Sequence, residues 1–169
     1  PLSASLAESE HALAVHMRLG DKEELDQSLV ETLDHLLREQ TALKQVVLHG
    51  SFKPEHTDHT SLNEWAVACR LETAVRALRK RFGDRVSYHV PQSEDVDLLL
   101  LSRSKHLLVH GGIHSAFIAI AATGKVYIPE KILLDYSPDF YRMLPSTATV
   151  IAQNGTAVSI GRFLRSLAL

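Results

Sequence analysis

The stretch that decides the fold occupies residues 12–22 and consists of ALAVHMRLGDK. Its first residues are apolar apart from His16, in a run short enough for a buried strand. Gly20 permits a sharp turn, and residues 24–40 then carry leucine and valine three and four positions apart, as one face of an amphipathic helix does. A strand, a turn and a helix are therefore predicted, which is the repeating unit of an α/β fold.

The same alternation continues along the chain. Further strands are predicted near residues 46–49, 85–90, 107–109, 125–128 and 148–152, with helices at 62–82, 93–104, from about 115 to 123 and at the C-terminus. Residues 129–147 have no clear pattern. Strands alternating with long helices imply a mostly parallel sheet with right-handed crossovers. We therefore expect one Rossmann-like, doubly wound α/β domain over residues 1–169, with its ligand at the carboxyl ends of the strands.

The composition narrows the classes of function. Apolar residues make up 45% of the chain and charged residues 22%, which is ordinary for a globular domain. A net charge of −2 offers no general attraction to nucleic acid or to anionic membranes, and no apolar run is long enough for a transmembrane segment. Cys69 is the single cysteine, so no internal disulfide is possible, and its place within a helix favours a buried thiol over a nucleophile.

The end of the first strand carries the pattern His-x-Arg-x-Gly-Asp, from His16 to Asp21. The planar guanidinium of Arg18 can hold phosphate oxygens through two parallel hydrogen bonds. Gly20 allows the backbone to approach a ligand closely, and Asp21 could orient Arg18 or His16. An exposed turn with an incidental arginine would show the same short pattern, so spacing alone leaves both interpretations open.

A second pattern, VHGGIHSAF, lies at residues 109–117. Gly111 and Gly112 form a turn before a helix that we expect to begin near Ser115. The free amides at a helix start bind anions, and the Ser115 hydroxyl could either cap the helix or donate to a phosphate. A simple turn with Ser115 as the N-cap is the structural alternative. His110 and His114 flank the turn and are candidates for lining a pocket.

The third candidate is Asp97, which is surrounded by leucines in its predicted helix. A carboxylate among so many apolar residues is costly to bury without a partner. Its place on an exposed stripe would explain it. Alternatively, it faces the ligand and accepts hydrogen bonds from N1–H and the 2-amino group of guanine, an edge that adenine lacks.

In the order of these elements and motifs, about two thirds of the chain resembles the GDP-fucose-binding domain of the fucosyltransferase superfamily. The resemblance implies the donor-binding half of a GT-B glycosyltransferase, with the acceptor-binding domain outside this chain. It implies that Arg18 binds the β-phosphate of the donor and is essential for activity. His16 and Asp21 would shape the same pocket. Lys22, the residue after Asp21, would belong to the same donor-binding site. Asp97 would contact guanine.

In this resemblance Ser115 lies beside the phosphates, within the turn that contains Gly112 and His114. The chain departs from the family at Leu19, where many members have a second arginine. It departs again at Gly-Gly-Ile-His-Ser, where serine or threonine is usual at several positions. These departures leave the identity of the GDP-sugar open.

The function expected from the resemblance is metal-independent transfer of a sugar from a GDP-sugar to a glycan or glycoprotein acceptor, without a cofactor and in either the cytoplasm or the Golgi/ER lumen. The pair Asp95 and Asp97 has the spacing of a metal-binding signature, but it falls within a helix. His56 and His59 are favoured as part of a solvated loop rather than as metal ligands. Two alternatives stay open: a polysaccharide pyruvyltransferase-like enzyme, in which Arg103 would be functional, and a non-catalytic module that binds nucleotide sugars or glycans.

Overall fold

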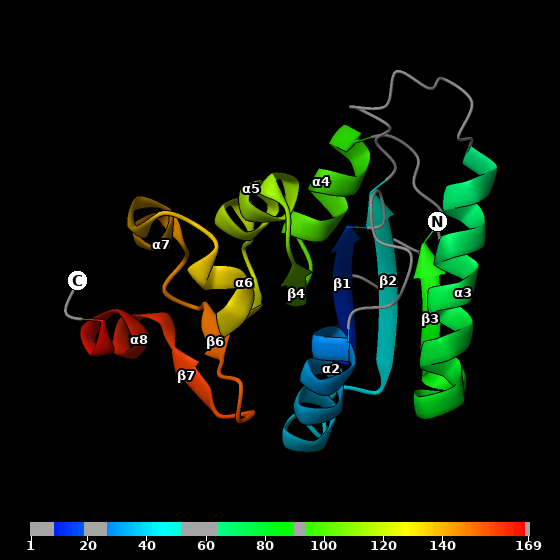
Figure 1. Ribbon diagram of the computed structural model, residues 1–169, viewed down its shortest axis with the longest axis horizontal. Helices are drawn as coiled ribbons and strands as arrows, with labels where there is room; N and C mark the ends of the chain where they lie inside the picture. Colours follow the sequence, from blue (N-terminus) through cyan, green and yellow to red (C-terminus); the bar gives the residue numbers. More distant parts are fainter. Residues whose placement is uncertain (1–8, 19–26, 52–63, 90–93, 168–169) are drawn as a thin grey trace.

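The computed structural model describes residues 9–18, 27–51, 64–89 and 94–167, and confirms the predicted α/β architecture. In this part of the chain, seven strands form one sheet in the order β3-β2-β1-β4-β5-β6-β7 (Figure 1). Six of the strands are mutually parallel and β7 runs antiparallel to β6. The strands are β1 (Ala12–Arg18), β2 (Gln45–Ser51), β3 (Val86–His89), β4 (His106–His110), β5 (Lys125–Pro129), β6 (Thr149–Ile151) and β7 (Ala157–Ser159).

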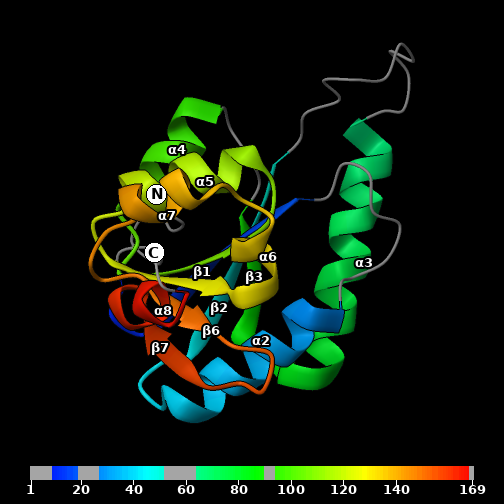
Figure 2. The same cartoon turned by 60° about the vertical axis from the view of Figure 1, so that its left-hand side comes forward.

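Helices cover both faces of the sheet, and each face has its own hydrophobic core (Figure 2). Helices α2 (Gln27–Glu39) and α3 (Glu64–Phe82) pack on one face, and a short 3-10 turn, Gly83–Arg85, follows α3. The opposite face is covered by α4 (Glu94–Ser102), α5 (Ile113–Ala121), α6 (Glu130–Leu134), α7 (Pro138–Met143) and α8 (Ile160–Ser166). The sheet is therefore doubly wound.

The central strand shows how the sequence supplies both cores. Successive side chains of a strand point to opposite faces, and in β1 Leu13 and Val15 join the core under α2 and α3. Ala14 belongs to the core under α4 and α5. Every residue from Ala12 to Met17 is buried. A strand buried on both faces has the nearly continuous apolar sequence observed here.

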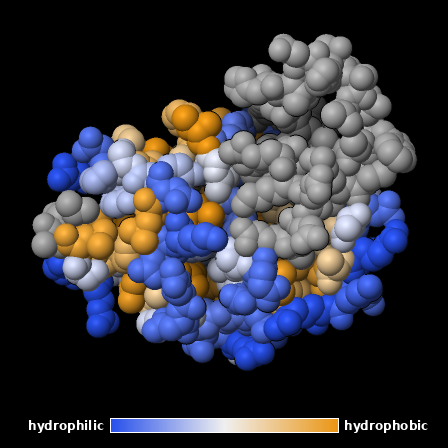
Figure 3. All heavy atoms as spheres, in the orientation of Figure 1, coloured by the Kyte–Doolittle hydropathy of each residue, from blue (hydrophilic) through white to orange (hydrophobic). Residues whose placement is uncertain are grey.

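The outer surface is hydrophilic on one side and more apolar on the other (Figure 3). Helix α2 buries Leu29, Leu33 and Leu36, and the residues that it exposes are polar, so the lower surface of the molecule is hydrophilic. The surface over α4 and α5 is more apolar, because Leu99, Ile113 and Phe117 are exposed there.

Besides the 3-10 turn, which includes Arg85 where a strand was expected to begin, three elements were not predicted from the sequence. Residues 129–147, expected to be irregular, contain the helices α6 and α7, which have five and six residues. Strand β7 has three residues and pairs with β6 after a turn at Gly155, where φ is 84°. Elements of this length are too short to show a period in the sequence.

Candidate functional site

The candidate site lies where the direction of the fold reverses, at the carboxyl ends of β1 and β4. The two strands are neighbours in the sheet, with His16 opposite Val109 and Met17 opposite His110. Helix α2, the next described element after β1, packs on one face, whereas α5, which follows β4, packs on the other. Connections that leave in opposite directions open a crevice between two strand ends, and open α/β sheets bind their ligands there.

Arg18, the residue with the most specific predicted role, is the last residue of β1. Its backbone is paired with Ser51 of β2, one position beyond the pair of Met17 and Gly50. The backbone of Arg18 therefore lies at the carboxyl edge of the sheet, next to the end of β4. Its side chain, and all of Gly20, Asp21 and Lys22, lie outside what the structure describes, so their roles stay predictions. The same holds for His56 and His59 and for the side chain of Cys69.

Two left-handed glycines join β4 to α5. Gly111 has a φ of 84° and Gly112 has a φ of 87°, values that residues other than glycine rarely adopt. Gly112 is the N-cap of α5, which begins at Ile113, so the prediction that Ser115 caps this helix is wrong. The turn needs two positive φ angles and is complete before Ser115, which therefore lies in the first helical turn. No side-chain hydrogen bond caps α5 among the described residues.

Two tyrosines hold this turn: Tyr136, which lies between α6 and α7, and Tyr141 of α7. The hydroxyl of Tyr136 donates a hydrogen bond to the carbonyl of Gly112 at 2.6 Å. The hydroxyl of the buried Tyr141 in turn donates to the carbonyl of Tyr136 at 2.9 Å. These contacts fix one peptide of the glycine turn. The bond to Gly112 was not predictable from the sequence, because Tyr136 lies 24 residues beyond its partner.

Ser115 faces into the protein, where it joins the glycine turn to β1. It is 1% exposed, and its hydroxyl donates a hydrogen bond to the carbonyl of Gly111. The same oxygen lies 2.6 Å from Nδ1 of His16, which is 3% exposed. The single hydroxyl hydrogen is therefore used within the protein. A contact of Ser115 with a phosphate stays a prediction for its backbone amide rather than for its hydroxyl.

Three buried histidines stand side by side across the sheet below this edge. His16, His49 and His89 occupy matching positions on β1, β2 and β3, and are 3%, 2% and 5% exposed. The rings of His49 and His89 have centroids 4.9 Å apart. Parallel register places all three on one face, the face covered by α4 and α5. No sequence pattern singled out His49, because the row forms only when three strands pair in register.

Burial keeps two of these rings neutral. It lowers the pKa of His16 to about 3, with a smaller contribution from the neighbouring His114. Burial likewise lowers the pKa of His49 to about 3, assisted by the nearby imidazoles of His89 and His16. Among the described residues, neither ring nitrogen of His49 has a hydrogen-bond partner. A charged imidazole is costly in an apolar interior, so both rings stay neutral at pH 7.

Asp97 lies at the far end of this row, in the first turn of α4. Its side chain is 16% exposed, and Oδ1 lies 3.3 Å from Nε2 of His89, without the alignment of a hydrogen bond. The aspartate is thus partly buried beside a histidine rather than on a fully exposed stripe. It lies at the same carboxyl edge as the glycine turn, because α4 follows the end of β3.

The two histidines that flank the glycine turn diverge, as their separation by two glycines predicts. Nε2 of His110 lies 3.2 Å from the hydroxyl of Ser28 on α2, on one face of the sheet. His114 lies on the other face, with its ring centroid 5.6 Å from that of His16. Of the pair, only His114 therefore lies beside the histidine row.

Arg103, the residue on which the pyruvyltransferase alternative depends, lies in the turn between α4 and β4. That turn is at the edge where the parallel strands begin, and β4 starts at His106. Arg103 is therefore separated by the length of the sheet from the crevice between β1 and β4.

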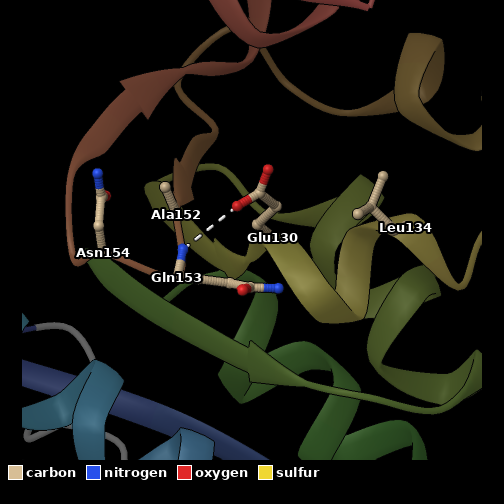
Figure 4. Close-up of a pocket in the computed structure, with 5 residues that line it drawn as sticks. All are labelled: Glu130, Leu134, Ala152, Gln153 and Asn154. Atoms are coloured by element: carbon tan, nitrogen blue, oxygen red, sulfur yellow. Dashed lines mark hydrogen bonds between the residues drawn. The ribbon is translucent and has the colours of Figure 1, made fainter.

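A shallow depression of about 370 Å³ lies elsewhere on the molecule, near the ends of β5 and β6 (Figure 4). Its lining consists of Glu130, Leu134, Ala152, Gln153 and Asn154. The carboxylate of Glu130 accepts a hydrogen bond of 3.2 Å from the amide of Gln153. None of the residues predicted from the sequence to bind the donor lines this depression.

Within the described residues, no group of three or more histidine, cysteine, aspartate or glutamate side chains is arranged to hold a metal ion. Among the helices in this part of the chain, none combines the length and apolar character needed to cross a bilayer. Comparison of the chain with protein-family models, curated proteins and solved structures gives no match.

Proposed function

We propose that this chain is the donor-binding domain of a glycosyltransferase. The enzyme would transfer a sugar, which we propose to be fucose, from a GDP-sugar to a glycan or glycoprotein acceptor. One observation carries the proposal: the end of β1 at Arg18 lies beside the end of β4, where Gly111 and Gly112 lead into α5. The backbone of an arginine therefore lies beside a helix start that no side chain of the described residues caps, at the ligand-binding edge of an open α/β sheet.

The diphosphate is the part of the donor that this edge suits best. The first three amides of α5 belong to Ile113, His114 and Ser115, and the start of a helix carries a partial positive charge. No acidic residue lies in the first turn of α5. Arg18 would add a guanidinium that holds two phosphate oxygens at once.

These same groups would promote the reaction. Cleavage of the bond between sugar and phosphate leaves negative charge on the departing diphosphate. Donors that are already oriented toward that charge stabilise the transition state, and removal of one such donor costs about 3 kcal/mol, roughly a hundredfold in rate. Because Arg18 and the α5 amides would supply this stabilisation, we expect transfer to continue in the presence of a chelator.

The base-binding role falls to Asp97. It lies in the first turn of α4 at the same edge of the sheet, and its side chain is 16% exposed. A carboxylate can accept hydrogen bonds from both N1–H and the 2-amino group of guanine. This pairing would select a guanine nucleotide over an adenine nucleotide.

Thermal unfolding in the presence of GDP, UDP, ADP and phosphoenolpyruvate tests the proposal. A ligand at about 100 times its dissociation constant stabilises a protein by about 2.7 kcal/mol, so the midpoint rises measurably. We expect GDP alone to raise it, and Arg18→Ala to abolish that rise. Arg162→Ala, which removes an exposed arginine of α8, is the matched control and should respond as the wild type does.

Other outcomes would favour the alternatives. A response to phosphoenolpyruvate that Arg103→Ala abolishes would contradict the proposal and support a pyruvyltransferase. Binding of GDP without transfer to any glycan or glycoprotein by the complete protein would identify a non-catalytic binding module.

A further inference from the structure

The hydrogen bonds around Ser115 determine which nitrogen of His16 carries a proton. A serine hydroxyl has one hydrogen, and the carbonyl of Gly111 can only accept, so the hydrogen of Ser115 points to that carbonyl. The oxygen of Ser115 lies 2.6 Å from Nδ1 of His16 and has no second hydrogen to donate. Nδ1 must therefore be the donor. A serine in the first turns of a helix commonly bonds to the carbonyl four residues earlier in this way.

Because burial keeps His16 neutral, a proton on Nδ1 leaves Nε2 with a lone pair. We propose that Ser115 is a positioning residue that holds His16 in this tautomer, and that Nε2 of His16 accepts a hydrogen bond from a hydroxyl group of the donor nucleotide. The second half of this inference rests on the proposed function, whereas the first half concerns the ligand-free protein.

The chemistry of the donor explains why a hydroxyl is the partner. Phosphate oxygens are acceptors at neutral pH, and two acceptors cannot form a hydrogen bond. The lone pair on Nε2 therefore disfavours the diphosphate, which we assign to Arg18 and the α5 amides. The ribose and the transferred sugar both carry hydroxyl groups that can donate. His16 would thus separate the sugar-binding part of the site from the phosphate-binding part.

Nitrogen-15 NMR of the ligand-free protein, labelled on its histidines, tests the tautomer at pH 7. His16→Gln identifies the resonances of His16 by their loss. We expect these resonances to show a protonated Nδ1 and an unprotonated Nε2. Ser115→Ala should shift the ring away from this tautomer, and Ser115→Thr, which keeps the hydroxyl, should restore it. A proton on Nε2 in the wild-type protein, or an unchanged tautomer in a folded Ser115→Ala variant, would overturn the inference.

Addition of nucleotides to the same labelled protein tests the ligand. If the ribose donates, GDP shifts the Nε2 resonance of His16 and 2′,3′-dideoxy-GDP does not. If the transferred sugar donates, only the GDP-sugar shifts it. Binding of both GDP and the GDP-sugar without any change at Nε2 would contradict the hydroxyl assignment. Absence of any nucleotide binding would instead overturn the proposed function, while the tautomer of the free protein would still be observed.

Discussion

The hydroxyl of Tyr136 is the side-chain group that ties the segment after α6 to the glycine turn. It donates to the carbonyl of Gly112, while its ring packs against Phe140 with centroids 4.5 Å apart. Tyr136→Phe keeps the ring and removes the donor, so we expect a loss of about 1 kcal/mol in the free energy of unfolding, measured by urea denaturation. Tyr88→Phe, at a residue that is 50% exposed, is the control. Equal losses in the two variants would show that the bond to Gly112 contributes nothing.

A second prediction at this scale concerns the nucleobase. Asp97→Asn keeps the shape of the side chain but replaces one acceptor by a donor, which guanine cannot pair with. A hydrogen bond to a charged group contributes about 1.5–3 kcal/mol, so the affinity for GDP should fall about 10- to 100-fold. Calorimetric titration measures this loss. The preference for GDP over inosine diphosphate, which lacks the 2-amino group, should shrink in parallel.

Asp95→Asn is the matched control for this experiment, because Asp95 lies in the same helix turn and is exposed. Its affinity for GDP should equal that of the wild type. An equal loss in both variants would indicate a general effect of charge, and the role of Asp97 in reading guanine would be refuted.

The sequence revealed the residues that local chemistry singles out and missed those defined by distant partners. Gly111 and Gly112 predict a turn. The pattern around Arg18 suggests recognition of an anion, and that around Asp97 suggests recognition of a nucleobase. The contact between the Ser115 oxygen and Nδ1 of His16 was not predictable, because the two residues lie 99 positions apart in the chain. For the same reason, the row formed by His16, His49 and His89 depends on strand register.

At the scale of elements, the β4–α5 connection depends on its backbone conformation. A Cβ on Gly111 would lie 3.6 Å from Cδ1 of Ile132, which is an ordinary contact, so space is not the constraint. The φ of 84° is the constraint, and a side chain there costs about 1–2 kcal/mol. Gly111→Ala should therefore lower the free energy of unfolding by about that amount and weaken binding of GDP, because the α5 amides would be displaced.

Gly161→Ala provides the contrast. Gly161 lies in α8, where an added Cβ would be 3.8 Å from the Arg165 guanidinium, and alanine favours a helix over glycine by about 1 kcal/mol. This variant should be as stable as the wild type or more stable in the same denaturation experiment. A Gly111→Ala variant that is equally stable would contradict the assigned strain.

The long elements followed from periodicity, and the short ones did not. Helix α2 shows leucines on one face over 13 residues, which is a clear signal. Helix α7 starts with Pro138, a favourable first residue for a helix, but its six residues make less than two turns. Strand β7 is stabilised by its pairing with β6, which no local property of residues 157–159 reveals.

At the scale of the whole molecule, the histidine row couples stability to pH. The pKa of His16 and that of His49 are about 3 in the folded protein, against 6.5 for a free histidine. Between about pH 3 and pH 6.5, these two rings therefore bind about two more protons in the unfolded chain than in the folded protein. The contribution of these rings to the free energy of unfolding is therefore fully present above about pH 6.5. It falls as the pH is lowered toward 3, by about 1.4 kcal/mol per pH unit for each ring.

Urea denaturation at intervals from pH 7 to pH 4 measures this slope. His49→Leu removes one of the two groups and fills the buried position with an apolar side chain, so the contribution of the pair to the slope should halve. If His49→Leu has the same pH dependence as the wild type, His49 takes up its proton equally well in the folded protein, and the neutral state assigned to His49 is wrong.

The proposed function requires a diphosphate to lie between the ends of β1 and β4. A crystal structure of the chain with GDP bound tests this most directly. We predict that the diphosphate contacts the Arg18 guanidinium and the amides at the start of α5, with guanine against Asp97. A nucleotide bound instead in the depression beside Glu130 and Gln153, with Arg18 and the glycine turn untouched, would contradict it.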